Sequence, residues 1–198
     1  MSGRGGASRR PRPARAGRSD GYTLIEVVFA AGLIAVLAAA AIPQLTAGLE
    51  RSRTVGAARY LASRLALARA QAVARSANVA LLLTAADGTF VVGTYVDGNG
   101  DGVRTRDITA GIDPVIGVPV RLSNLFPHVA LSLNDPAVTS TFDTSALMSF
   151  SPLGTASSRT LYLRGADGSQ YAVRVLGATG RTRVLRFVAS NGAWVEVL

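Results

Sequence analysis

Cysteine and lysine are absent from this sequence of 198 residues, histidine occurs once, and aromatic residues make up 6%. Without cysteine the chain forms no disulfide and no thiolate metal site, so its folded part depends on a hydrophobic core. The single histidine, His128, follows Phe126-Pro127 and precedes an apolar segment, a setting more typical of a structural histidine. No Gly-x-Ser-x-Gly elbow and no phosphate-binding glycine loop occurs either. These absences predict that the protein is not an enzyme.

All 21 basic residues are arginine, and their distribution is uneven. Residues 1–21 hold six arginines and one acidic residue, Asp20, so removing this segment would lower the net charge from +9 to +4. Arginine at one end of a membrane span favours the cytoplasmic side. We therefore expect a cytoplasmic amino terminus and a carboxyl-terminal domain on the other side of the membrane.

An apolar run follows the arginines. No charged residue occurs from Val27 to Ile42, and a helix from Tyr22 to Ile42 would be about 31 Å long, the thickness of a bilayer's hydrocarbon core. Glu26 is the one charged residue in the span from Tyr22 to Ile42. A carboxylate in a membrane span is costly unless it is paired, so we expect Glu26 to have a functional role. Two other interpretations are an ordinary signal anchor and a secretory signal peptide cleaved near residues 38–41. The length of the run and the presence of Glu26 oppose the second.

Residues 21–28, GYTLIEVV, resemble the prepilin-type amino terminus shared by type IV pilins and the pseudopilins of type II secretion. The family usually has phenylalanine where Tyr22 stands. The resemblance implies cleavage after Gly21 by a prepilin peptidase, methylation of the new amine of Tyr22, and assembly on an inner-membrane platform. The exposed amine would then pair with Glu26 of a neighbouring subunit, which offsets the burial of both charges.

The chain beyond Pro43 remains helical in pattern but becomes amphipathic up to Asn78. Arginines lie mostly outside the apolar face, where we expect them to be solvated. The residues that define this face are Leu45, Leu49, Leu61, Leu65, Ala68 and Ala72.

The remainder of the chain is rich in short strands and turns. A hairpin is predicted across residues 85–88, with Asp87-Gly88 in its turn. Tyr171, Val173 and Val175 alternate with more polar residues, as in a half-buried antiparallel strand. The expected strands are Val79–Thr84, Thr89–Val96, Val115–Leu122, His128–Leu133, Leu147–Ser151, Thr160–Arg164, Gln170–Leu176, Arg183–Val188 and Ala193–Val197, with a mobile loop over Leu133–Ser145.

Three later segments resemble the family of the minor pseudopilin H and FimT-like minor pilins. They are residues 66–73 (ALARAQAV), residues 150–154 (FSPLG) and residues 180–184 (GRTRV). Members of this family prime or cap a filament and are not its bulk subunit. With the amino-terminal motif, the resemblance covers most of residues 21–185.

Residues 97–102, DGNGDG, offer oxygen atoms at alternate positions and a glycine at the sixth, as in the first half of an EF-hand calcium loop. The candidate ligands are Asp97, Asn99 and Asp101. The twelfth position is Ile108 instead of glutamate, Asp107 is a possible substitute, and no helical pattern frames the loop. A hydrated turn after a strand explains the same residues, so Ca²⁺ is one of two interpretations.

Arg181 and Arg183 stand two apart at the start of a predicted strand, so both would project from one face toward successive phosphates. The segment resembles the Gly-Arg-x-Arg motif that FimT-like pilins of transformable bacteria use to capture extracellular DNA. The alternative is that a Gly-Arg turn simply begins a strand.

These patterns predict an α+β, type IV pilin-like fold in which a long amino-terminal helix packs on antiparallel β-sheets. The expected parts are a basic leader (1–21), a membrane-spanning helix half (22–43), an amphipathic helix half (44–78) and a β-rich periplasmic domain (79–198). The predicted protein is a single-pass inner-membrane minor pilin or pseudopilin. It would join other subunits at the tip or start of a pilus or pseudopilus and contact partner subunits or secreted cargo. The sequence leaves open whether the machine is a secretion system or a type IV pilus.

Overall fold

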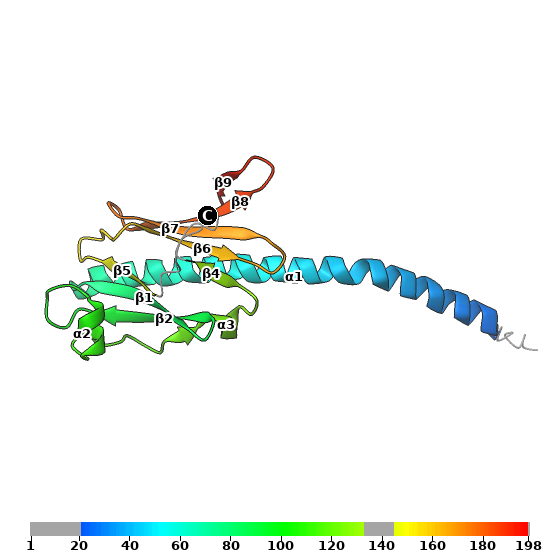
Figure 1. The fold of residues 1–198 in the computed structure, drawn as a ribbon, viewed down its shortest axis with the longest axis horizontal. Coiled ribbons are helices and arrows are strands. Elements are labelled where there is room, and N and C mark those ends of the chain that lie inside the picture. The colour runs from blue at the N-terminus through cyan, green and yellow to red at the C-terminus, as the bar shows by residue number, and fades with distance from the viewer. Residues whose placement is uncertain (1–20, 133–144, 198) are drawn as a thin grey trace, which may run out of the picture. The chain divides into compact units, whose positions relative to one another are not determined.

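The computed structural model describes residues 21–132 and 145–197. The predicted leader, apart from Gly21, and all but the last residue of the predicted loop Leu133–Ser145 lie outside the described residues. The chain divides into two compact units, Met1–Ile42 and Pro43–Leu198, which are considered separately below. Figure 1 shows the elements in chain order, beginning with helix α1 (Leu24–Arg75), which supplies residues to both units.

Thr23 caps the amino-terminal end of α1. Its side-chain oxygen accepts a hydrogen bond from the backbone N–H of Glu26 at 3.4 Å, and its carbonyl accepts from Glu26 and Val27. Threonine followed three residues later by glutamate is the sequence of a capping box, and an acidic residue in the first turn suits the helix dipole. The prepilin-like motif therefore also contains the local signal that starts the helix.

The carboxyl-terminal end of α1 is a Schellman motif. Ser76 has a positive φ of 50°, its N–H donates to the carbonyl of Val73, and the N–H of Ala77 donates to that of Ala72. The helix thus ends at Arg75, three residues before the boundary at Asn78 expected from the sequence, and β1 begins at Val79.

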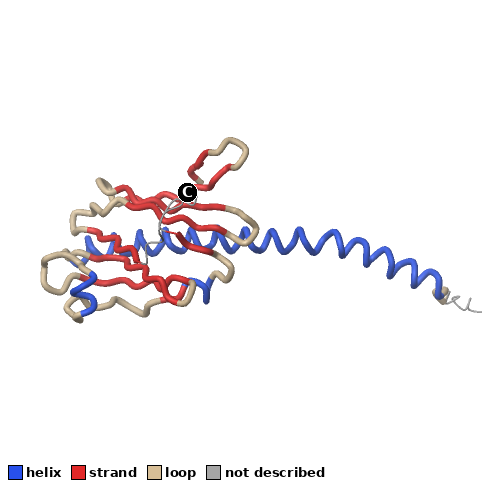
Figure 2. The backbone as a smooth tube through the Cα atoms, in the orientation of Figure 1, coloured by secondary structure: helices blue, strands red, loops and turns tan. Residues whose placement is uncertain are grey.

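The second unit contains two antiparallel sheets, whose strands are drawn in red in Figure 2. The four-stranded sheet has the order β3-β2-β1-β5, and the five-stranded sheet has the order β4-β6-β7-β8-β9. This arrangement confirms the predicted α+β fold. The strands are β1 (Val79–Ala86), β2 (Thr89–Val96), β3 (Val120–Arg121), β4 (Ala130–Ser132), β5 (Ser145–Phe150), β6 (Arg159–Arg164), β7 (Gln170–Leu176), β8 (Arg181–Val188) and β9 (Ala193–Glu196).

The hairpin of β1 and β2 is formed as predicted. Both central turn residues, Asp87 and Gly88, have positive φ (48° and 74°), which is the requirement of a type I′ turn. Val79 pairs with Val96 at the open end and Ala86 with Thr89 beside the turn, so the hairpin is in register along its whole length.

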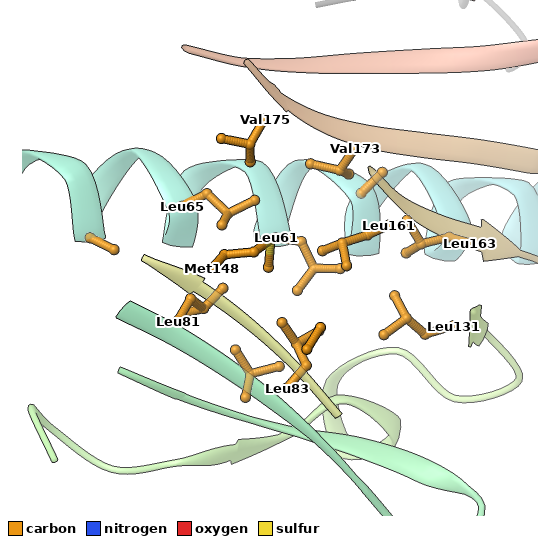
Figure 3. Close-up of a cluster of buried hydrophobic side chains, with 14 of the residues drawn as sticks. Leu61, Leu65, Leu81, Leu83, Leu131, Met148, Leu161, Leu163, Val173 and Val175 are labelled. Atoms are coloured by element: carbon orange, nitrogen blue, oxygen red, sulfur yellow. The ribbon is translucent and has the colours of Figure 1, made fainter. Parts of the chain in front are cut away.

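The core of the second unit lies where α1 meets both sheets. Figure 3 shows Leu61 and Leu65 of α1 pointing toward leucine, methionine and valine side chains of β1, β4, β5, β6 and β7. Leu61, Leu65, Ala68 and Ala72 are all completely buried, which confirms this part of the predicted apolar face. The two sheets are therefore joined through the helix rather than by shared strands.

Two members of that predicted face are exposed. Leu45 and Leu49 are 67% and 58% exposed, and the first fully buried helix residue of this unit is Thr54. Their helical spacing is correct, but tertiary packing leaves both side chains largely exposed.

The strand predicted over Val115–Leu122 is mostly wrong. Within this segment only Val120–Arg121 forms a strand, β3, although Val115 makes an isolated bridge to Tyr95 and Ile116 donates its N–H to the carbonyl of Thr94 at 2.7 Å. Gly117 has a φ of 79° and Pro119 offers no N–H, so neither suits a strand interior. Two short helices, α2 (Thr105–Thr109) and α3 (Leu122–Leu125), lie on either side of this segment and have no clear sequence pattern.

Candidate functional site

Gly21 and Tyr22 precede the first turn of α1 in non-helical backbone, and both are exposed. Glu26 lies in the first turn, is also exposed, and forms no ion pair within the described residues. By length and composition, the amino-terminal part of α1 is apolar enough to cross a membrane, and none of the apolar window is buried. The predicted processing residues therefore form one accessible segment at the head of an unburied apolar helix.

A second candidate site lies where residues 66–73, 150–154 and 180–184 meet. Arg69, within residues 66–73, donates a hydrogen bond from Nε to the carbonyl oxygen of Gly154 at 3.0 Å. Gly180 packs against both: a Cβ placed there would collide with that oxygen and lie 2.9 Å from Arg69 Nε. Since Gly154 and Gly180 also have positive φ (79° and 60°), glycine is favoured at each position. Segments far apart in the sequence are thus joined at one point of the second unit.

A cavity of about 520 Å³ opens beside this junction, between α1 and the start of β8. Three arginines line it, Arg59, Arg69 and Arg181, together with the apolar side chains of Ala62, Ala66 and Val184. No acidic residue among those described lines the cavity, and neither Arg59 nor Arg181 forms an ion pair with a described residue. The described lining of the cavity therefore combines three arginines with apolar side chains and carries a net positive charge.

The sequence interpretation did not single out Arg59 or Arg69 as site residues, because the helix arginines were expected to be solvated; Arg59 is exposed as expected, whereas Arg69 is half-buried. The spacing of residues 59, 62, 66 and 69 places them along one stripe of a helix, which was the available signal. A neighbouring arginine also departs from that expectation, since Arg64 donates from Nη2 to the hydroxyl of Thr94 at 3.1 Å.

The two arginines predicted to bind DNA differ in their surroundings. Arg181 lines the cavity, whereas Arg183 donates from Nη1 to Glu196 on β9 at 3.0 Å. Arg183 lies opposite Arg174 in the register of β7 and β8, so these two share a face of the sheet. DNA binding through Arg181 and Arg183 remains a prediction, and the carboxylate of Glu196 lies beside the guanidinium group of Arg183.

Asp97 holds the loop that was interpreted as a possible calcium site. Its carboxylate accepts hydrogen bonds from the Nδ2 of Asn78 and from the backbone N–H groups of Asn99, Gly100 and Gly102, at 2.7–3.2 Å. Burial raises the pKa of Asp97, but these hydrogen bonds outweigh it and hold the pKa below its ordinary value of 3.8. The loop is closed by N–H donors that a cation would have to replace.

The other loop oxygens have partners as well. The side-chain oxygen of Asn99 accepts from the N–H of Asp101, and Asp101 pairs with Arg104 at 2.5 Å and with Arg106 at 3.4 Å. Buried Asp107 lies on α2, the short helix that follows the loop although no helical pattern was seen there. The described residues contain no group of three or more histidine, cysteine, aspartate or glutamate side chains that could hold a metal ion. Calcium binding by Asp97, Asn99 and Asp101 remains one of the two interpretations of this loop.

A long helix with an apolar amino-terminal part, followed by antiparallel sheets, defines a pilin-like subunit. The model of the family described as Type II transport protein GspH matches residues 57–180, and the chain belongs to this family. It is therefore a minor pseudopilin of type II secretion, a structural subunit and not an enzyme, and its partners include other pseudopilin subunits. Its apolar helix fits a single-pass protein of the inner membrane.

The chain is similar to a solved structure, that of the minor pseudopilin EpsH from the Type 2 Secretion System of Vibrio cholerae. It is 14% identical, with a TM-score of 0.46, and the match covers 68% of this chain and 97% of that one. No protein of curated function matches the sequence. The family segment 57–180 contains the whole Arg69–Gly154–Gly180 junction and ends immediately before Arg181.

Proposed function

We propose that this minor pseudopilin is cleaved between Gly21 and Tyr22, methylated on the amine of Tyr22, and assembled into the pseudopilus through Glu26. The supporting observation is the exposed segment at the head of α1, in which the proposed cleavage bond precedes the helix and Glu26 has no ion pair with a described residue. Cleavage would create an amine four residues before Glu26. In a filament, that amine and the glutamate of the neighbouring subunit would compensate each other's charge away from water.

The arginine-rich leader orients the chain before cleavage. Its six arginines favour a cytoplasmic amino terminus, which sends the β-rich unit into the periplasm. The prepilin peptidase and the assembly platform would then be partners at the inner membrane, and the subunit would act at the start or the tip of the pseudopilus. Secreted cargo is the partner expected for the exposed periplasmic unit.

Intact-mass spectrometry of the protein extracted from membranes tests the proposal. We expect a mass that corresponds to loss of residues 1–21 and gain of one methyl group. Gly21→Val should block cleavage without disturbing the fold, because no atom lies within 4 Å of a Cβ placed at Gly21. Gly32→Ala is the matched control, since its Cβ position is equally open and lies beyond the proposed site. An uncleaved wild-type mass would refute the processing.

A further inference from the structure

The cavity beside the Arg69–Gly154–Gly180 junction is a candidate binding site because its positive charge has no counterpart. Arg59, Arg69 and Arg181 line a space of about 520 Å³, and of their side chains only that of Arg69 has a described hydrogen bond, to a neutral carbonyl. Like charges placed together repel one another, and an anion between them removes that cost. The arrangement therefore favours a negatively charged ligand.

The uncharged residues that line the cavity indicate which kind of anion fits it. Ala62, Ala66 and Val184 are apolar, and the hydroxyl of Thr182, which also lines the cavity, is buried with no hydrogen-bond partner among the described residues. A carboxylate on a short apolar stem matches this combination: its oxygens accept from guanidinium groups and its methylene groups contact the apolar walls. Glutamate and aspartate side chains have this form.

The geometry favours a protein carboxylate over a nucleic acid. A strand of DNA presents phosphates in succession and needs a track of cations along the surface. Here Arg183, the next arginine along β8, is already paired with Glu196, and that carboxylate would repel a second phosphate. A group of three arginines around one open cavity suits a single side chain better than a polyanion.

We propose that this cavity binds a glutamate or aspartate side chain presented by a neighbouring pseudopilin subunit, with Arg59 and Arg181 as its main cationic contacts and Arg69 as the support. The proposal rests on the assembly function proposed above and adds the chemistry by which the periplasmic unit recognises a partner. All residues that line the cavity belong to the second unit, residues 43–198, and none of them belongs to the processing segment.

Arginine side-chain NMR of the full chain in detergent micelles tests the site directly. The probes are N-acetyl-Ala-Glu-Ala-amide, the matched glutamine peptide, inorganic phosphate and a short single-stranded oligonucleotide. We expect the glutamate peptide, and not the glutamine peptide, to shift the Nε–H signals of Arg59, Arg69 and Arg181. Arg181→Gln and Arg59→Gln should each weaken binding of the glutamate peptide about tenfold, whereas Arg174→Gln, an exposed arginine of β7, should not change it.

Several outcomes would overturn the proposal. No response to the glutamate peptide, or an equal response to the glutamine peptide, would exclude a carboxylate site. Tighter binding of the oligonucleotide would assign the cavity to nucleic acid, and an equal response to phosphate would make it a general anion site. Intact mass measured on the same preparation reports processing after Gly21 independently, so failure of either proposal can be recognised separately.

Discussion

The Nε of Arg69 donates to the carbonyl oxygen of Gly154 at 3.0 Å, across 85 positions of sequence. This hydrogen bond ties α1 to the loop between β5 and β6, and Gly180 packs against both partners just before β8. Three segments that carry the family resemblance therefore have a shared structural task in addition to any binding role. The glycine of the Gly-Arg-x-Arg segment is required by packing, independently of what its arginines contact.

Gly180→Ala should strongly destabilise the second unit. Its φ of 60° is strained for alanine and its Cβ would collide with the Gly154 carbonyl, so we expect a loss of about 3 kcal/mol in the free energy of unfolding. Gly168→Ala is the control, because its φ of 81° is also positive but its Cβ would meet open space. Urea unfolding of the full chain, followed through the single tryptophan, Trp194, measures both. Equal losses in the two variants would contradict the packing role.

Leu61→Ala should create a cavity in the core where α1 meets the two sheets. Leu61 is completely buried, and truncation of such a leucine costs about 3 kcal/mol. Leu67→Ala is the matched control on the same helix, because Leu67 is 47% exposed and should lose well under half as much. The same urea experiment compares them. A small effect at Leu61 would mean that the helix does not hold the sheets together.

Sequence pattern predicted well those elements that local chemistry determines. The hairpin at Asp87-Gly88 follows from turn residues acting over a few positions. Leu61 and Leu65 were placed correctly in the core, but Leu45 and Leu49 have the same period and are exposed. Periodicity shows which face of a helix is apolar, and only tertiary structure shows how much of that face is covered.

The candidate sites also differ in how well the sequence predicts them. The processing segment is continuous in sequence and was found from its motif, whereas the arginine-lined cavity joins Arg59 and Arg69 to Arg181, over a hundred residues later. No local pattern pairs such positions. The same limit applies to Arg183. Its position two residues after Arg181 predicts a shared face of the strand, but it does not reveal Glu196 on the next strand as the partner of Arg183.

The stability of the second unit should fall in acid through protonation of Asp97. The folded-state pKa of Asp97 lies below 3.8, so the unfolded chain takes up this proton first. The stabilisation is therefore complete above the unfolded pKa of about 4 and is lost as pH falls through the folded value. Asp97→Asn should lower the urea midpoint at neutral pH and flatten its decline in acid. Asp87→Asn, at an exposed ion pair with Arg121, should have little effect on either.

A calcium titration distinguishes the two interpretations of the same loop. If the hydrogen bonds from Asn78 and three backbone N–H groups alone stabilise it, added Ca²⁺ leaves the melting temperature unchanged, and this is the result that we expect. A calcium loop would instead show a rise in melting temperature that increases with Ca²⁺ concentration. Asp97→Asn would abolish that rise.

Glu26→Gln should separate processing from assembly. The substitution leaves Gly21, Tyr22 and the cap residue Thr23 in place, so cleavage and methylation should continue. A neutral side chain cannot compensate the amine of a neighbouring subunit, however, and an unpaired charge buried in a filament is strongly unfavourable. We expect recovery in the sheared pseudopilus fraction to fall about tenfold or more, measured by immunoblot beside the intact mass. Glu26→Asp keeps the charge on a shorter stem and should recover part of the loss. Normal incorporation of the Glu26→Gln variant would show that assembly does not require the charge of Glu26.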